Sequence, residues 1–246
     1  MMADPRSLSV VVPAYNEAAQ IQRTLDELRT YLTAMPFSWE VRVVDDGSED
    51  TTRAIVARAS ERDARIVLQA EPHGGKGAAV RAGMLKSTAN LRFLCDADLS
   101  MPLPELPRFL DIVPAQCDIA LGSREGAGAR RVDEPGYRHV MGRAFNRLVR
   151  GALLPDMDDT QCGFKLFSGP AADAVFRQLT IDGWAFDIEA LFVARRLGLR
   201  IREIPIEWHY REHSHVSPVR DAILMARDVA RVRFNAARGK YVVSRG

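Results

Sequence analysis

The sequence has few cysteines and almost no net charge. Its three cysteines among 246 residues are widely spaced, at Cys95, Cys117 and Cys162. An odd number at such spacing argues against a disulfide framework and against a zinc cluster, so we expect each cysteine to be a small buried residue in a reducing compartment. A formal net charge of +2 gives no general reason to expect a nucleic-acid partner.

Long apolar runs are also absent. No segment approaches the roughly 18 consecutive apolar residues that a membrane-spanning helix needs, and residues 1–6 show no signal-peptide pattern. We therefore expect a cytoplasmic protein, with any membrane association peripheral and at the cytoplasmic face. The arginines are unevenly placed, however. Seven lie from Arg124 to Arg150 with only three acidic residues, which indicates a local anionic partner.

Short apolar segments alternate with helical patterns through the first half of the chain. The segments expected as strands are residues 8–12, 41–44, 66–68, 91–95 and 118–121, and those expected as helices are residues 17–32, 51–60, 74–86 and 104–113. This regular alternation predicts an α/β fold with a mainly parallel central sheet and helices on both faces.

The second half is less regular. We expect a mobile loop over residues 122–136, followed by a basic helix (137–154), a strand (160–167), a helix (185–197), a strand (200–206) and a last helix (218–239). We divide the chain into a catalytic domain, residues 1–212, and a C-terminal amphipathic helix within residues 213–246. Apolar residues flanked by arginines suit a helix at a lipid surface. Packing on the domain, or on a second copy in a homodimer, explains the pattern equally well.

Polar residues follow three of the predicted strands at the point where each ends. They are Tyr15 and Glu17 after the first strand, Asp45 after the second, and Asp96 and Asp98 after the fourth. Because parallel sheets bind ligands at the carboxyl ends of their strands, we expect these side chains to share one site. Mg²⁺ and Mn²⁺ are often held by one or two carboxylates and completed by substrate phosphates, which makes Asp96 and Asp98 candidate metal ligands. Two acids at a strand end can also simply face water.

Two basic segments are candidates for binding phosphate. Residues 74–77 open a helix with backbone N–H groups and Lys76, a pattern that suits a phosphate, although a flexible turn with a solvated lysine explains it as well. Arg124, Arg131 and Arg138 lie in or beside the predicted loop, and guanidinium groups match phosphate oxygens in bidentate geometry. Most surface arginines are only solvated, so we expect one or two of these to touch a ligand.

Asp159 stands ahead of a predicted strand in the segment Asp158-Asp159-Thr160-Gln161-Cys162-Gly163-Phe164-Lys165. It has three open interpretations: a base, a partner that orients Lys165, or a residue that caps a turn.

Taken together, these motifs resemble the family 2 glycosyltransferases, and among them the polyprenyl-phosphate sugar synthases. The glucosyl branch that acts on dolichyl phosphate is more similar than the mannosyl branch. The matching stretches, in the family's order, are residues 10–17, 43–48, 75–83, 96–100, 122–124, 159–167 and 184–189. The resemblance implies a Rossmann-like nucleotide-sugar transferase fold of the GT-A type. It also implies inverting, metal-dependent transfer of a hexose, first of all from UDP-glucose, to a polyprenyl or dolichyl phosphate.

The resemblance further implies roles for individual residues. The donor nucleotide would be held by Pro13, Tyr15, Glu17, Asp45, Lys76 and Asp96, the metal by Asp96 and Asp98, and the acceptor phosphate by Arg124, Arg131 and Arg138. Asp98, Asp159, Arg124 and Arg138 are the candidate catalytic residues. A lipid phosphate is already anionic and needs alignment more than a base. A saccharide hydroxyl would need a base, and Asp159 would then be the candidate.

Two positions depart from the family pattern. His215 stands where a lysine that reaches the diphosphate is usual, so Arg211 is a candidate to supply that charge. Ser100 stands where mannosyl relatives usually carry glutamine. GDP-mannose and a UDP-N-acetylhexosamine remain alternative donors. Asp96 and Asp98 argue against a non-catalytic binding module. A nucleotidyltransferase would need a loop rich in glycine and arginine near the N-terminus for the release of pyrophosphate. Residues 8–22 contain no glycine, which argues against that class.

Overall fold

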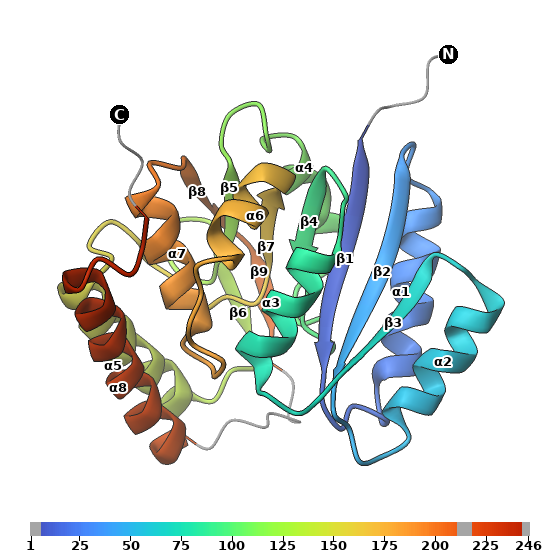
Figure 1. Ribbon diagram of the computed structural model, residues 1–246, viewed down its shortest axis with the longest axis horizontal. Coiled ribbons are helices and arrows are strands. Elements are labelled where there is room, and N and C mark those ends of the chain that lie inside the picture. Colours follow the sequence, from blue (N-terminus) through green and yellow to red (C-terminus); the bar gives the residue numbers. More distant parts are fainter. Residues whose placement is uncertain (1–5, 211–217, 243–246) are drawn as a thin grey trace.

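The chain forms a seven-stranded sheet with the strand order β3-β2-β1-β4-β7-β5-β8 (Figure 1). The computed structural model describes residues 6–210 and 218–242, without the side chains of residues 137, 138 and 218–223. The strands are β1 (Ser7–Ala14), β2 (Ser38–Asp46), β3 (Ile66–Glu71), β4 (Leu91–Leu94), β5 (Ile119–Ser123), β7 (Lys165–Ser168) and β8 (Ile201–Pro205).

All the pairings in this sheet are parallel except those of β7. Strands β1, β2, β3 and β4 pair in parallel, as do β5 and β8. Strand β7 runs antiparallel between β4 and β5, and its first residue, Lys165, lies beside both Leu94 and Leu121. The prediction of a mainly parallel sheet is confirmed. The reversed strand matters for the site, because it starts at the edge where its neighbours end.

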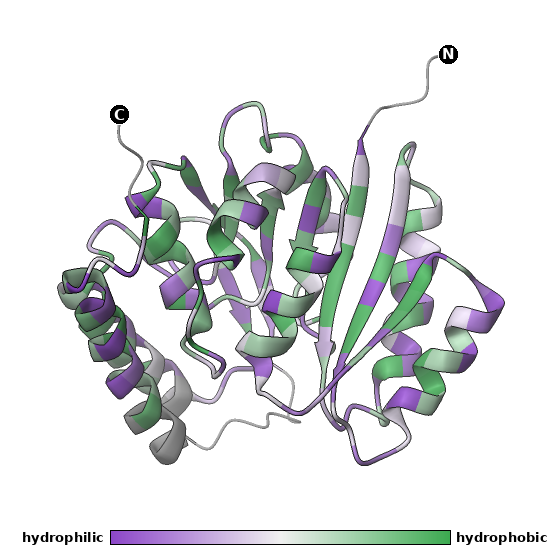
Figure 2. Cartoon of the chain, in the orientation of Figure 1, coloured by the Kyte–Doolittle hydropathy of each residue, from purple (hydrophilic) through white to green (hydrophobic). Residues whose placement is uncertain are grey.

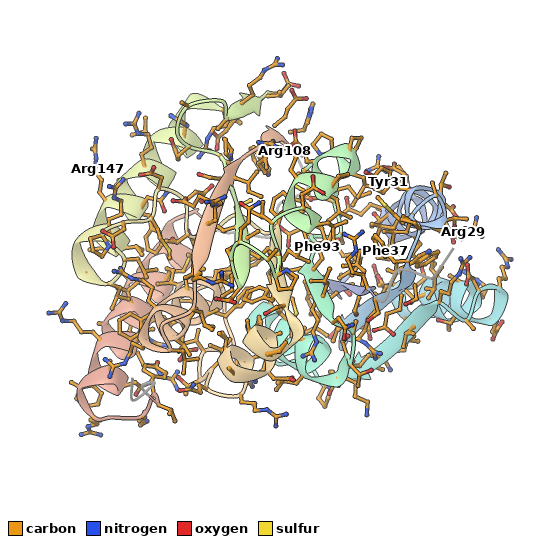
Figure 3. All side chains as sticks on the ribbon, turned by 90° about the horizontal axis from the view of Figure 1, so that it is seen from above. Arg29, Tyr31, Phe37, Phe93, Arg108 and Arg147 are labelled. Carbon is orange, nitrogen blue, oxygen red and sulfur yellow. The ribbon has the colours of Figure 1, made fainter. Side chains whose placement is uncertain are left out.

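Helices cover both faces of the sheet. Figures 1 and 3 show α1 and α4 on one face and α3 and α6 on the other, while α2 packs beside the edge strand β3. The helices are α1 (Ile21–Thr33), α2 (Thr52–Arg62), α3 (Lys76–Lys86), the short 3₁₀ helix η1 (Leu103–Glu105), α4 (Leu106–Leu110), α5 (Gly136–Ala152), α6 (Gly169–Phe176), α7 (Phe186–Arg196) and α8 (Pro218–Ala237).

The core lies between these helices and the apolar strands, which stand out in Figure 2. In α1, Ile21, Leu25, Leu28 and Leu32 are all buried, so the predicted helical spacing is confirmed. Phe93 of β4, labelled in Figure 3, is fully buried. It makes an edge-to-face contact of 5.9 Å between ring centroids with Phe109 of α4. Burying each large apolar side chain contributes about 1.5–3 kcal/mol to folding.

Two predicted boundaries were wrong. Helix α1 begins at Ile21 rather than at residue 17, because the amide of Glu17 bonds to Thr52 Oγ1 and that of Ala18 to Asp50. The strand predicted over residues 160–167 begins only at Lys165.

The predicted loop 122–136 contains β6 (Arg130–Val132), which pairs in parallel with β9 (Glu207–His209). Both strands are three residues long and polar, and their pairing is non-local. The sequence pattern therefore gives no sign of them.

Helix α8 packs on the domain and lies beside α5 and α7 (Figure 1). Met225, Val229 and Val232 are buried, whereas Leu224 and Phe234 remain exposed. The predicted helix is confirmed, and one of its faces is a packing face. The division of the chain at residue 212 stays a prediction, because residues 211–217 lie outside the described parts. No helix in those parts is both long and apolar enough to cross a bilayer.

Candidate active site

The strand ends converge on an ion pair between Lys76 and Asp96. Asp96 follows β4, and Lys76 is the first residue of α3. Lys76 Nζ lies 2.7 Å from Asp96 Oδ1 and 5.3 Å from the centroid of the Trp184 ring. Burial alone would lower the pKa of Lys76, but the negative charges of Asp96, Asp187 and Asp98, with the hydrogen bond to Asp96, together outweigh it, so the pKa of the ammonium is raised. Lys76 is therefore a firmly charged cation at the sheet edge.

Asp98 completes an acidic pair with Asp96. Burial raises the pKa of Asp98 and the negative charge of Asp96 adds to the effect, while the amide of Ser100 donates to Asp98 Oδ1 at 2.9 Å. Among the described residues, no three His, Cys, Asp or Glu side chains gather as a metal-binding group. A cation held here would have two protein carboxylates and would need further oxygen ligands from a substrate, as Mg²⁺ commonly does.

Gly163 lets Asp96 occupy its position. The start of β7 brings residues 159–164 to the same edge, and a Cβ atom on Gly163 would lie only 1.9 Å from Asp96 Oδ2. Real Cβ contacts are never this short, so any side chain here would displace the carboxylate. The sequence quotes this glycine within a motif but gives no sign that it touches Asp96.

Four of the backbone N–H groups of residues 74–78 are not free for a phosphate. Those of Gly74 and Gly75 donate to the Asp46 carboxylate at 2.8 and 3.0 Å, and those of Gly77 and Ala78 donate to the carbonyl of Asp182 at 2.7 and 3.2 Å. The prediction that residues 74–77 offer free amides to a phosphate was therefore wrong for Gly74, Gly75 and Gly77. What the segment presents to the site is the charge of Lys76.

A stacked pair of rings lies beside this segment. The Tyr15 ring stacks on His73 with 4.4 Å between centroids and 26° between planes. His73 Nδ1 lies 3.0 Å from both the carbonyl and a carboxylate oxygen of Asp46. Sequence reasoning missed His73, whose only signal is that it stands near the end of a strand.

The remaining predicted nucleoside residues lie at the ends of β1 and β2. Asp45 is fully buried, and its carboxylate accepts from Arg53 Nε at 2.9 Å and from the Ser48 amide at 3.3 Å. A carboxylate has about four lone-pair positions, so these contacts do not exhaust it. Pro13 pairs with Val44 of β2, and Glu17 lies in the turn that leads into α1. The structure brings these residues to one edge with Tyr15.

Asp159 forms a second buried ion pair, with Arg124. Its carboxylate accepts from the Arg124 amide at 2.9 Å, from Nε at 2.7 Å and from Nη2 at 2.9 Å. Burial pushes the pKa of Asp159 upward, but the Arg124 charge and these hydrogen bonds outweigh it and set the pKa at about 2. On β8, the carboxylate of Glu203 accepts from the amides of Asp158 and Asp159 at 3.0 and 2.9 Å. Asp159 is held as an ionised partner of Arg124.

Asp159 does not orient Lys165, so that interpretation was wrong. Lys165 is buried in the sheet and pairs with Asp187 at 2.6 Å, because α7 and not the Asp159 turn packs over this part of β7. Its ammonium also donates to the Cys162 carbonyl.

The three cysteines are buried and unpaired, as predicted.

The other predicted arginines have different placements. Arg131 forms ion pairs with Glu125 at 2.9 Å and Glu134 at 2.8 Å, and its Nε donates to the Arg124 carbonyl at 3.1 Å. Its charge is thus balanced, and it supports the segment that carries Arg124. Arg138 lies in α5, but its side chain is outside the described parts. Arg211 and His215 lie outside them altogether.

A groove of about 990 Å³ opens on the far side of Leu99, between α1 and the segment that leads into α4. Its walls include Gln22 and Asp26 on one side and Met101 and Leu103 on the other. Of the predicted site residues that the structure describes, none lines it. The groove is therefore separate from the charged cluster.

Comparison with known proteins decides the family. Residues 9–176 match glycosyl transferase family 2. The chain belongs to this family. It is 33% identical to the dolichyl-phosphate beta-glucosyltransferase of Dictyostelium discoideum over 241 residues, which cover 92% of the chain and 74% of the relative. For the Homo sapiens enzyme of the same name, identity is 32%, with 96% and 78% covered. The chain is therefore a glycosyltransferase.

Solved structures confirm the predicted GT-A type of fold. Glucosyl-3-phosphoglycerate synthase from Mycobacterium tuberculosis, in complex with Mn²⁺, UDP-glucose and phosphoglyceric acid, superposes with a TM-score of 0.69 at 20% identity, covering 94% of this chain and 79% of that one. Mannosyl-3-phosphoglycerate synthase from Rubrobacter xylanophilus gives a TM-score of 0.69 at 19% identity, with 96% and 76% covered.

The Arg124–Asp159 pair makes a testable contribution to stability. In Asp159→Asn the buried guanidinium loses its counter-charge, and we expect a loss of about 3 kcal/mol in the free energy of unfolding at pH 7. Because the pKa of Asp159 is lowered to about 2 from an ordinary value near 3.9, the contribution is complete above about pH 4 and fades as the pH falls through 2. Urea unfolding at several pH values measures this.

Asp156→Asn is the control for that experiment. Asp156 is exposed, its pair with Arg195 lies at the surface, and its loss should cost less than about 1 kcal/mol. Equal stability of Asp159→Asn and the native chain at pH 7 would contradict the role given to the pair.

Gly163→Ala should weaken divalent metal binding. The added methyl group displaces Asp96, and changes of this kind around metal ligands typically cost about 10–100-fold in affinity. Titration with Mn²⁺ followed by electron paramagnetic resonance measures it. Gly151→Ala is the matched control, because no atom lies within 4 Å of a Cβ there. Native Mn²⁺ affinity in Gly163→Ala would refute the steric argument.

Proposed function

We propose that the protein is an inverting, metal-dependent transferase that moves glucose from UDP-glucose to a polyprenyl or dolichyl phosphate. One observation carries the choice of acceptor. The Asp159 carboxylate is committed to Arg124 and ionised down to a pKa of about 2, which makes it a poor proton acceptor near neutral pH. An acceptor phosphate is already anionic and needs no base, whereas a saccharide hydroxyl does.

Two comparisons support the donor and the acceptor. The relatives that cover most of this chain are named as dolichyl-phosphate beta-glucosyltransferases. A structural neighbour with the same fold was solved with UDP-glucose, Mn²⁺ and a phosphorylated acceptor. The site has matching chemistry, with a ring pair for a nucleoside and separate cationic groups for two phosphate-bearing ligands.

Asp96 and Asp98 fit a divalent cation. Their carboxylates lie close enough that burial and the Asp96 charge raise the pKa of Asp98, and a cation held by both would relieve this repulsion. Both would supply hard oxygen ligands. When bound, such a cation neutralises charge on the diphosphate that leaves the sugar.

The chain's own residues would divide the remaining work. Tyr15 offers a ring face to the nucleobase, and Asp45 accepts a hydrogen bond from the nucleoside. Lys76 adds positive charge beside the diphosphate. Pro13 and Glu17 shape the β1 turn, and Arg211 is proposed to supply a further positive charge to the diphosphate. Each of these groups stabilises the leaving nucleotide.

The acceptor phosphate would meet the arginines of the other half of the site. Asp159 fixes the guanidinium of Arg124 by bidentate hydrogen bonds, and Arg131 binds the Arg124 carbonyl. Arg138 is proposed to contact the phosphate from α5. Holding the phosphate in line with the sugar would turn a bimolecular encounter into an oriented reaction.

We place the enzyme at the cytoplasmic face of a membrane, in peripheral contact through α5. Val140, Met141 and Leu148 are exposed on this helix, and its arginines include Arg147, which points outward in Figure 3. Apolar side chains flanked by arginines suit an anionic lipid surface. Met141→Ser with Leu148→Ser should reduce co-sedimentation with anionic vesicles, while Val242→Ser, at an even more exposed apolar residue outside α5, should not. Unchanged binding, or a homodimer that buries α5, would overturn this contact.

The decisive assay offers a panel of donors to the purified enzyme with polyprenyl phosphate and Mg²⁺ or Mn²⁺. UDP-glucose should give a glucosyl lipid, and GDP-mannose and UDP-N-acetylglucosamine should give much less. Asp98→Ala should lose about 10²–10³-fold in kcat, as expected when charge stabilisation in the transition state is removed. Asp111→Ala, an exposed acid at the end of α4, is the control. Absence of a glycolipid from every donor would reject the proposal.

A further inference from the structure

The loop between α6 and α7 lies directly against the backbone that carries Lys76. Figure 1 shows this loop descending toward the first turn of α3. The Asp182 carbonyl accepts from the amides of Gly77 and Ala78. A Cβ atom on Gly75 would lie 2.7 Å from the Asp182 carbonyl oxygen, so no side chain fits between the two segments. We call residues 178–184 the clamp loop.

Side chains strengthen the same contact. Arg81 of α3 forms an ion pair of 2.7 Å with Asp182 and donates to the Leu179 carbonyl at 3.2 Å. At the end of the loop, the Trp184 ring faces the Lys76 ammonium. The clamp loop therefore contacts both the first turn of α3 and the ammonium of Lys76. If the loop moved, the cation beside Asp96 would move with it.

A buried carboxylate holds the clamp loop from the other side. Glu189 of α7 is fully buried. It accepts from the amides of Thr180 and Ile181 at 2.9 and 2.8 Å, and from the Thr180 hydroxyl at 2.7 Å. Burying a carboxylate costs free energy unless hydrogen-bond donors occupy its lone pairs. These charge-assisted bonds are therefore strong, and they fix the direction of each donor. They fix the loop at the two residues before Asp182.

The fourth donor to Glu189 comes from the C-terminal segment. The Tyr241 hydroxyl donates to Glu189 at 2.7 Å, and the Tyr241 ring packs edge-on against Phe192 at 5.9 Å. Asn235, in the last turn of α8, donates to the Thr180 hydroxyl at 3.1 Å. Burial and the Glu189 contact raise the pKa of Tyr241 to about 12, so the phenol stays a donor at any physiological pH.

We propose that Glu189 and Tyr241 are positioning residues for Lys76. Through hydrogen bonds they hold the clamp loop against α3, and the loop fixes the position of the Lys76 ammonium beside Asp96. The segment after α8 thereby takes part in placing the donor diphosphate, although it lies outside the strand-end cluster. The donor role of Lys76 rests on the proposed function, whereas the mechanical link does not.

Tyr241→Phe tests the link without requiring a substrate. The variant keeps the ring and removes one hydrogen bond from buried Glu189. We expect amide hydrogen exchange at Gly77 and Ala78 to become at least about threefold faster, because their acceptor Asp182 is held less firmly. Tyr31→Phe, on α1, is the matched control and should leave exchange at these two amides unchanged. Native exchange rates in Tyr241→Phe would overturn the proposal.

The affinity for the donor nucleotide tests whether this link affects function. By calorimetry with UDP and Mg²⁺, Tyr241→Phe should bind about 3–10-fold more weakly, with no further loss when it is added to Lys76→Met. Equal losses in the native and the Lys76→Met backgrounds would show that Tyr241 acts independently of Lys76 and would overturn the positioning role. If the native chain bound no UDP, the proposed donor would fail, and exchange at Gly77 and Ala78 would still decide the link.

Discussion

The contact between Lys76 and Asp96 is the interaction on which the rest of the site depends. It joins the first residue of a helix to the end of a central strand, and it forms only because neighbouring backbones approach unusually closely. Gly163 leaves room for the Asp96 carboxylate, and Gly75 leaves room for the clamp loop. Gly163 reaches this place because β7 runs antiparallel to β4. Only that direction brings the turn before β7 to the edge where β4 ends.

The two halves of the site separate their charges. On the proposed donor half, two carboxylates and one lysine leave a net negative charge that suits a divalent cation and the nucleotide it would accompany. On the proposed acceptor half, Arg124 is held by Asp159 in a buried, hydrogen-bonded pair that fixes its direction. Such an arrangement serves transfer between two phosphate-bearing molecules, in which alignment and stabilisation of the leaving group matter more than proton abstraction.

Much of this could be predicted from the sequence. Apolar periodicity located the main strands and helices, and the strand-end rule gathered Tyr15, Asp45, Asp96 and Asp98 into one site. The failures share a physical cause, which is that they depend on contacts between distant segments. The amides at residues 74–77 looked free because neither Asp46 nor Asp182 is near them in sequence. Lys165 looked like a partner of Asp159, although α7 brings Asp187 closer. Gly163 and Glu189 stand inside matched motifs, but only the folded chain shows what each one touches.

The acceptor chemistry is tested most directly by comparing two lipids of the same chain length, polyprenyl phosphate and the unphosphorylated polyprenol, with UDP-glucose and Mg²⁺. A site whose buried acid is already paired with Arg124 should form a glucosyl product from the phosphate and none from the alcohol. A glucosylated polyprenol formed at a comparable rate would contradict the phosphate acceptor and would require a base that the Arg124–Asp159 pair does not provide.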